Sequence, residues 1–138
     1  MEEKTIFEVI HGMDTVTNRL IIQWNKSFNA DLGISHILVL AHLREHGKSR
    51  PSDIARALGL TPATLTHLSN KLVKKQLAVR VADESDRRIM YLNITEEGRE
   101  MTVKANVEGR KLRRELFEKL TDEEVEQLLR IFGKWSAD

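Results

Sequence analysis

The chain has 138 residues, 41% hydrophobic and 31% charged, with a net charge of +1, which is the size and balance of one soluble globular domain. It has no cysteine, which excludes a disulfide framework, a thiolate nucleophile and thiol-based sensing. No apolar run approaches the ~20 residues of a membrane span, and the acidic N-terminus lacks a signal peptide's apolar segment, so we expect a cytoplasmic protein with no membrane contact.

Helical spacing of apolar residues predicts an amphipathic helix over residues 5–28 and a second helix that ends at Gly47. Ser35 is the expected N-cap of the second helix. Its expected buried stripe consists of Ile37, Leu40 and Leu43.

Proline and glycine mark two further helices in the middle of the chain. Pro51 is expected in the first turn of a short helix that Gly59 ends. Thr61 is expected to cap the next helix, with Pro62 in its first turn and an end near Gln76. The two helices would be joined by a tight turn.

Beyond residue 76 the period of the apolar residues changes from helical to alternating. Residues 77–95 alternate around the polar run 82–88, which predicts a two-stranded antiparallel hairpin with a charged tip. A long helix is expected over residues 95–120. A last helix follows, where Thr121 and Glu124 form a capping box.

Charge is unevenly distributed along the chain. From Arg44 to Arg88 there are ten Lys and Arg against five Asp and Glu, and the remainder holds twelve against sixteen. A basic middle between acidic arms favours an anionic partner for the middle. The alternative is chance clustering on a solvated surface.

The first and the last two helices carry many apolar residues, and one chain of this size has no inner layer that could bury all of them. We expect burial against a second copy, although packing within one chain remains the alternative. The residues concerned are Ile6, Phe7, Leu116, Phe117, Leu120, Leu128, Leu129, Ile131, Phe132 and Trp135.

The order of the elements predicts the fold class. A helix, a short helix, a turn, a longer helix and a hairpin with a basic tip form a winged helix-turn-helix. The sequence therefore predicts a mainly α protein with a small β wing. We expect a DNA-binding domain at 31–94 and a helical dimerisation region at 1–30 and 95–138.

The second helix of such a pair lies in the major groove of DNA. Leu65, Leu68 and Leu72 share one face and are expected to pack inward. Side chains on the opposite face are short, polar or basic, which suits contact with base edges and phosphates, while a solvated helix face is the alternative. The expected DNA contacts on this helix are Thr61, Ala63, Thr64, Thr66, His67, Asn70, Lys71 and Lys74.

The hairpin tip adds Asp86, Arg87 and Arg88 to the expected contacts. An arginine at this position can enter the minor groove, whose negative potential favours it. Asp86 is expected to hold an arginine in one rotamer, although an ordinary exposed turn is the alternative.

From Ser52 to Gly98 the sequence resembles the MarR family of bacterial transcription regulators, through "DIARALGLTPATLTHLSNKL" and "DRRIMYLNITEEG". The resemblance implies a two-fold dimer on a palindromic operator, with Arg88 in the minor groove and Asp86 orienting it. The family usually has a glycine before the Leu that follows the recognition helix, whereas this chain has Gln76. We expect Gln76 to take a left-handed cap, at a cost of about 1 kcal/mol, or a different turn.

His42-x-x-Glu45-His46 matches the motif of an inverted zinc protease. The helix is already assigned to a DNA-binding domain and no third ligand stands out, so we expect neither catalysis nor a metal or other cofactor. A regulatory metal site on these histidines is the alternative. Relatives in the family bind small-molecule effectors between the dimer helices and the reading domain. Candidate effector contacts here are His11, Arg19, Trp24, His36 and His42.

Two hypotheses for the function follow. The first is a homodimeric, sequence-specific repressor of double-stranded DNA whose affinity a small-molecule effector alters. The second is a winged-helix module that binds another protein instead of DNA, and its support is the low net charge. The basic middle, the wing tip and the polar helix face favour the first.

Overall fold

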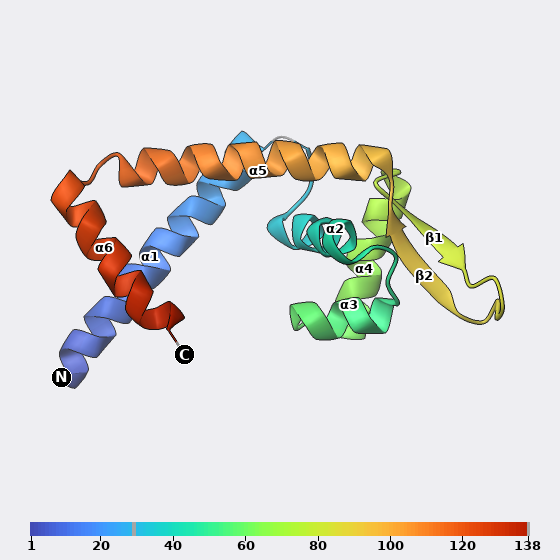
Figure 1. The fold of residues 1–138 in the computed structure, drawn as a ribbon, viewed down its shortest axis with the longest axis horizontal. Helices are drawn as coiled ribbons and strands as arrows, with labels where there is room; N and C mark the ends of the chain where they lie inside the picture. The colour runs from blue at the N-terminus through green and yellow to red at the C-terminus, as the bar shows by residue number, and fades with distance from the viewer. Residues whose placement is uncertain (29, 138) are drawn as a thin grey trace. The chain divides into compact units, whose positions relative to one another are not determined.

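The computed structural model describes residues 1–28 and 30–137. The described residues form mainly helices and a single two-stranded antiparallel sheet, which confirms the predicted fold class. No helix in these residues combines the length and apolarity needed to cross a membrane. The elements are α1 (Glu3–Ser27), α2 (Ile34–His46), α3 (Pro51–Leu58), α4 (Pro62–Lys74), β1 (Ala78–Ala82), β2 (Met90–Ile94), α5 (Glu96–Phe117) and α6 (Asp122–Ser136) (Figure 1).

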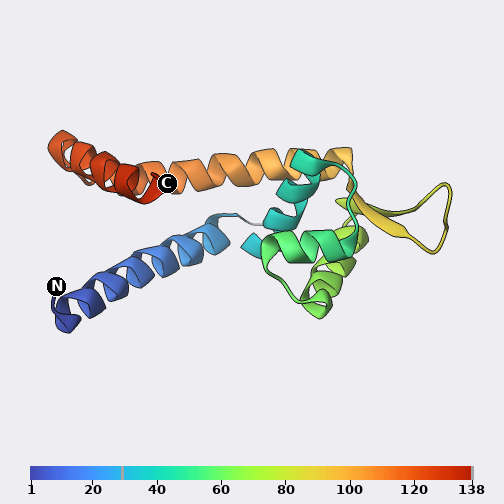
Figure 2. The same cartoon turned by 60° about the horizontal axis from the view of Figure 1, so that its bottom comes forward.

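The chain divides into two compact units, and α5 contributes residues to both. One unit consists of Asn25–Asn106 and contains α2, α3, α4 and the hairpin. The other consists of Met1–Trp24 and Val107–Asp138. In the first unit the hairpin projects away from the cluster of three helices as a wing (Figure 2).

Apolar side chains from α2, α3, α4 and β2 form the core of the unit 25–106. The fully buried ones are Val39, Leu40, Leu43, Ile54, Leu65, Leu72 and Leu92. Two expectations for α2 were wrong. Gly33, not Ser35, is its N-cap, because the Nδ1 atom of His36 accepts a hydrogen bond from the Gly33 N–H at 3.0 Å. Val39 is fully buried, while Ile37 stays partly exposed.

The turn between α3 and α4 has the predicted caps. Gly59 takes the left-handed conformation, with φ of 66°, which costs a glycine nothing. The Leu60 N–H bonds the Ala55 carbonyl at 2.8 Å and closes the end of α3. The Thr61 hydroxyl accepts from the Thr64 N–H at 3.1 Å and caps the start of α4.

At the end of α4, Gln76 has φ of 62°, so of the two expectations for this residue the left-handed cap is the correct one. Its N–H bonds the Val73 carbonyl at 3.0 Å, and the Leu77 N–H bonds the Leu72 carbonyl at 2.9 Å. These two bonds define a Schellman cap, completed by the buried side chains of Leu72 and Leu77. The cap turns the chain directly into β1.

The base of the hairpin is fixed to the start of α5. The Thr95 N–H bonds the Leu77 carbonyl at 3.1 Å, and the Thr95 hydroxyl donates to the Gln76 carbonyl at 2.8 Å. Gly98 lies so close to this segment that an added Cβ would stand 2.2 Å from the Leu77 carbonyl oxygen and 2.7 Å from Cγ1 of Ile94. Position 98 therefore requires glycine for steric reasons.

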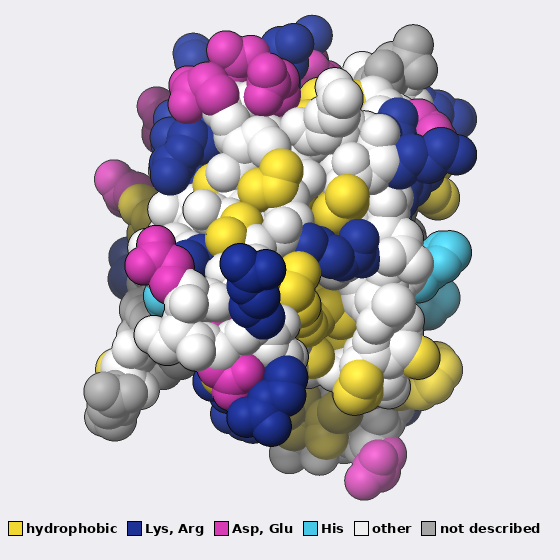
Figure 3. All heavy atoms as spheres, turned by 90° about the vertical axis from the view of Figure 1, so that its right-hand side faces the viewer, with side chains coloured by type: hydrophobic (Ala, Val, Ile, Leu, Met, Phe, Trp, Pro, Cys, Tyr) yellow, Lys and Arg dark blue, Asp and Glu magenta, His cyan; other side chains and the backbone are white. Residues whose placement is uncertain are grey.

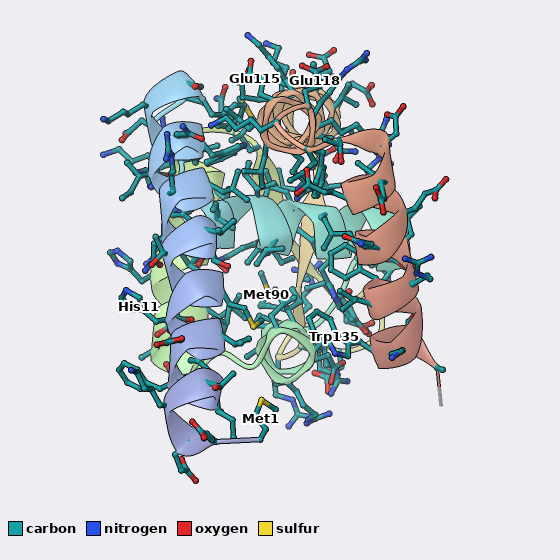
Figure 4. The ribbon with its side chains drawn as sticks, turned by 90° about the vertical axis from the view of Figure 1, so that its left-hand side faces the viewer. Met1, His11, Met90, Glu115, Glu118 and Trp135 are labelled. Carbon is teal, nitrogen blue, oxygen red and sulfur yellow. The ribbon has the colours of Figure 1, made fainter. Side chains whose placement is uncertain are left out.

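The other unit exposes many of its apolar side chains. Phe7 is 71% exposed, Leu129 64% and Trp135 66%. Figure 4 labels Trp135, which projects from α6. α6 begins with the predicted capping box, in which Thr121 accepts from the Glu124 N–H and the Glu124 side chain accepts from the Thr121 N–H.

Candidate nucleic-acid interface

The two faces of α4 differ as predicted. Leu65, Leu68 and Leu72 are buried, so the opposite face points away from the core. The Thr66 hydroxyl donates to the Pro62 carbonyl at 2.9 Å, so its hydrogen is already used within α4. The predicted contacts Thr61, Ala63, Thr64, Thr66, His67, Asn70 and Lys74 are exposed, and Lys71 is half-buried.

Asn70 is bound by an arginine that the sequence analysis did not select. Arg80 on β1 donates from its guanidinium to Oδ1 of Asn70 at 2.5 Å. Alternation in the hairpin puts Arg80 on the face opposite Val79 and Val81, and this pattern was the available signal. The pair joins the wing to the exposed face of α4.

Lys71 is not free on the helix surface. Its ammonium lies 3.4 Å from Oδ1 of Asp31, and Lys75 lies 3.7 Å from Oδ2 of the same carboxylate. The two ammonium groups, Lys71 foremost, lower the pKa of the Asp31 carboxyl, so it stays charged. Asp31 follows α1 and precedes α2, and no local pattern in the sequence pointed to this ion pair.

The wing tip is organised around a second carboxylate that the sequence analysis missed. Oδ2 of Asp83 accepts the backbone N–H groups of Ser85 and Asp86, each at 3.0 Å. Its Oδ1 accepts from the Tyr91 hydroxyl at 3.1 Å. These donors, the two backbone groups first, lower the pKa of Asp83. Lys48 places its ammonium 5.0 Å from the Tyr91 ring centroid.

Asp86 in turn holds Arg88 with a two-point contact. Nε and one terminal nitrogen of Arg88 each donate to an oxygen of the Asp86 carboxylate at 3.0 Å. The contact lowers the pKa of Asp86 and raises that of Arg88, so both stay charged. Figure 3 shows Lys and Arg side chains spread over this end of the unit, together with Asp and Glu side chains, several of which gather at the upper edge of the view.

The predicted effector residues divide between the two units, so the effector site stays a prediction. His11, Arg19 and Trp24 belong to one unit, and His36 and His42 to the other. The first two are exposed, and Figure 4 shows His11 on α1. Trp24 is buried. His36 is partly buried, and this burial is the main cause that lowers its pKa.

The histidine motif forms a pair on the surface of α2. The rings of His42 and His46 have their centroids 4.4 Å apart. Burial, with the charge of His46, lowers the pKa of His42. Over residues 1–28 and 30–137, no group of three or more His, Cys, Asp or Glu is arranged to hold a metal ion.

Comparison with known proteins adds independent findings. The model of the MarR family matches residues 32–90. The HTH-type transcriptional regulator YhbI of Bacillus subtilis (strain 168) is 32% identical over 103 residues, covering 75% of this chain and 67% of that protein. The transcriptional repressor MdtR of the same organism is 32% identical over 101 residues, covering 72% and 64%.

A solved structure with a similar fold is the YusO protein of Bacillus subtilis. It aligns with a TM-score of 0.81 at 22% identity, over 99% of this chain and 97% of that chain. The fold, the sequence match and the geometry of α4 and the wing agree, and the chain belongs to the MarR family of transcriptional regulators.

Proposed function

We propose that the protein is a homodimeric, sequence-specific repressor that binds a palindromic operator in double-stranded DNA. The observation that carries the proposal is the pairing of two surfaces in one unit. The exposed polar face of α4 has the chemistry to meet base edges in the major groove. Beside it, the wing presents Arg88 already oriented by Asp86. One relative, MdtR, is itself named a transcriptional repressor.

A second copy is the proposed partner of the exposed apolar side chains on the terminal helices. Large apolar groups such as Phe7, Leu129 and Trp135 are costly to leave in water. A two-fold dimer would bury the same surface on both copies and would present two α4 helices to the two halves of a palindrome.

The proposal also includes a small molecule that lowers the affinity for DNA. Nε2 of His36 is buried without a hydrogen-bond partner within the described residues. A ligand acceptor at this atom would satisfy it, which makes His36 the best-supported of the predicted effector contacts.

The test is fluorescence anisotropy with duplexes from the region upstream of the protein's own gene, at several salt concentrations. We expect tight binding to one duplex and weak binding to a scrambled one. Log affinity should fall steeply with log salt, because lysines and arginines displace phosphate counterions.

Lys74→Ala should make the salt slope less negative by roughly 1 for each protomer, because one phosphate contact is lost. Lys104→Ala removes the same charge from an exposed position on α5 and serves as the matched control. Equal affinity for every duplex together with a flat salt slope would favour the protein-binding module instead.

A further inference from the structure

Asn70 and Arg80 are both exposed, yet the structure fixes how the Asn70 amide is turned. Arg80 donates to Oδ1 of Asn70 at 2.5 Å. A guanidinium carries donors and no acceptor, so only the oxygen of the amide can face it. The amide nitrogen, with its two N–H donors, is the polar atom left for another partner.

We propose that Arg80 makes Asn70 a donor-only reader that selects a G·C base pair and rejects A·T at its position in the operator. The inference rests on the proposed function, since it concerns which base the helix reads. Arg80 is thereby assigned as a specificity-determining residue, although it lies on the wing strand and not on α4.

Base-edge chemistry supplies the reason. An asparagine reads adenine with two bonds, donating to N7 and accepting from the N6 amino group. Oδ1 of Asn70 already accepts from a charged donor, which forms a stronger bond than a neutral amino group does. The second lone pair of Asn70 Oδ1 does not restore the adenine contact. If it accepted from the adenine amino group, the N–H groups of Arg80 would stand beside that amino group, and two sets of donors would face each other.

Guanine offers the opposite pattern, with acceptors at both N7 and O6. The Asn70 amide can donate to one of them, and the remaining N–H groups of Arg80 can donate to the other. Thus the bound pair presents donors to a base edge that has only acceptors there. Free asparagine and paired asparagine therefore have different base preferences, and Arg80 decides between them.

The experiment selects binding sites from a random duplex library with the full-length protein and three variants. Asn70→Ala identifies the base position that Asn70 reads, because preference there should disappear. Arg80→Met removes the guanidinium and keeps the apolar stem. Arg87→Met removes the same charge from an exposed arginine of the same hairpin and is the matched control. Circular dichroism checks that all variants are folded.

We expect wild type to select G·C at the Asn70 position. Arg80→Met should shift the preference to A·T by roughly tenfold, the size of one two-point base contact. Arg87→Met should lower the recovery of all sequences alike and keep G·C. Replacing that guanine with 7-deazaguanine should weaken wild-type binding.

Three results would overturn the inference while leaving the proposed function intact. They are an A·T preference in wild type, an unchanged preference in Arg80→Met, and an Asn70→Ala variant that alters no position. A wild-type protein that enriches no sequence over the starting library would overturn the proposed function as well.

Discussion

Gln76→Gly should stabilise the protein, although it removes a side chain and changes no core residue. Gln76 has φ of 62°, where a residue with a Cβ pays roughly 1–2 kcal/mol. Glycine removes that strain, but its greater conformational freedom in the unfolded chain lowers the stability by roughly 0.5–1 kcal/mol. The net gain is about 0.5–1 kcal/mol, or a melting temperature higher by roughly 1–4 °C. The capping hydrogen bonds of Gln76 come from its backbone and are kept.

The control is the opposite kind of substitution, Gly59→Ala, at the other left-handed cap of the same unit. Its φ is 66°, and an added Cβ would meet nothing within 4 Å, so its cost is purely conformational. We expect a loss of about 1 kcal/mol. The assay is urea unfolding followed by circular dichroism at one fixed protein concentration, since association would shift the midpoint. Destabilisation by Gln76→Gly, or no effect of Gly59→Ala, would refute the reasoning.

Three further predictions concern steric fit, DNA binding and assembly. Gly98→Ala should lower the free energy of unfolding by roughly 1–3 kcal/mol in the same assay, because the new Cβ would overlap the Leu77 carbonyl. Gly109→Ala is the control: it has open space around it and should raise the free energy of unfolding by roughly 0.5–1 kcal/mol. Asp86→Ala should weaken operator binding roughly tenfold although it removes negative charge, and should add little in an Arg88→Ala background; a double-mutant cycle that is fully additive would contradict the orienting role. Deletion of residues 121–138 should give monomers or aggregates in light scattering, and an unchanged dimer would count against α6 as part of the interface.

Local patterns allowed most of the fold to be predicted. A helix cap involves residues three or four apart, so the Thr61 cap, the Gly59 stop and the capping box of Thr121 could be read from the sequence. For Gln76, resemblance to the family left two alternatives, a left-handed cap or a different turn, and the structure shows the left-handed cap. The error at Ser35 was also local: His36 caps its own helix by accepting from Gly33, and a capping histidine competes with the expected serine.

The contact of Asp86 with Arg88 was predicted and is confirmed, because the two residues are only two positions apart. Two other contacts of the candidate site could not be predicted, because they join residues that only the folded chain brings together. Asp31 meets Lys71 across the unit, and Arg80 meets Asn70 from the next element. Composition shows that these charged and polar groups exist, but it does not show which of them the fold brings together. The sequence pattern therefore located the reading helix, and the structure was needed to show which of its polar atoms are already engaged.

The hydrogen bonds at the base of the hairpin limit where residues can be inserted into the chain or deleted from it. An inserted residue between Gln76 and Ala78 would displace the carbonyls that Thr95 binds, and an insertion between Thr95 and Gly98 would push a side chain into the space beside Leu77. At the tip, an extra residue between Asp83 and Asp86 would disturb one short turn. Insertions and deletions among related sequences should therefore be concentrated at the tip of the wing and be absent from its base.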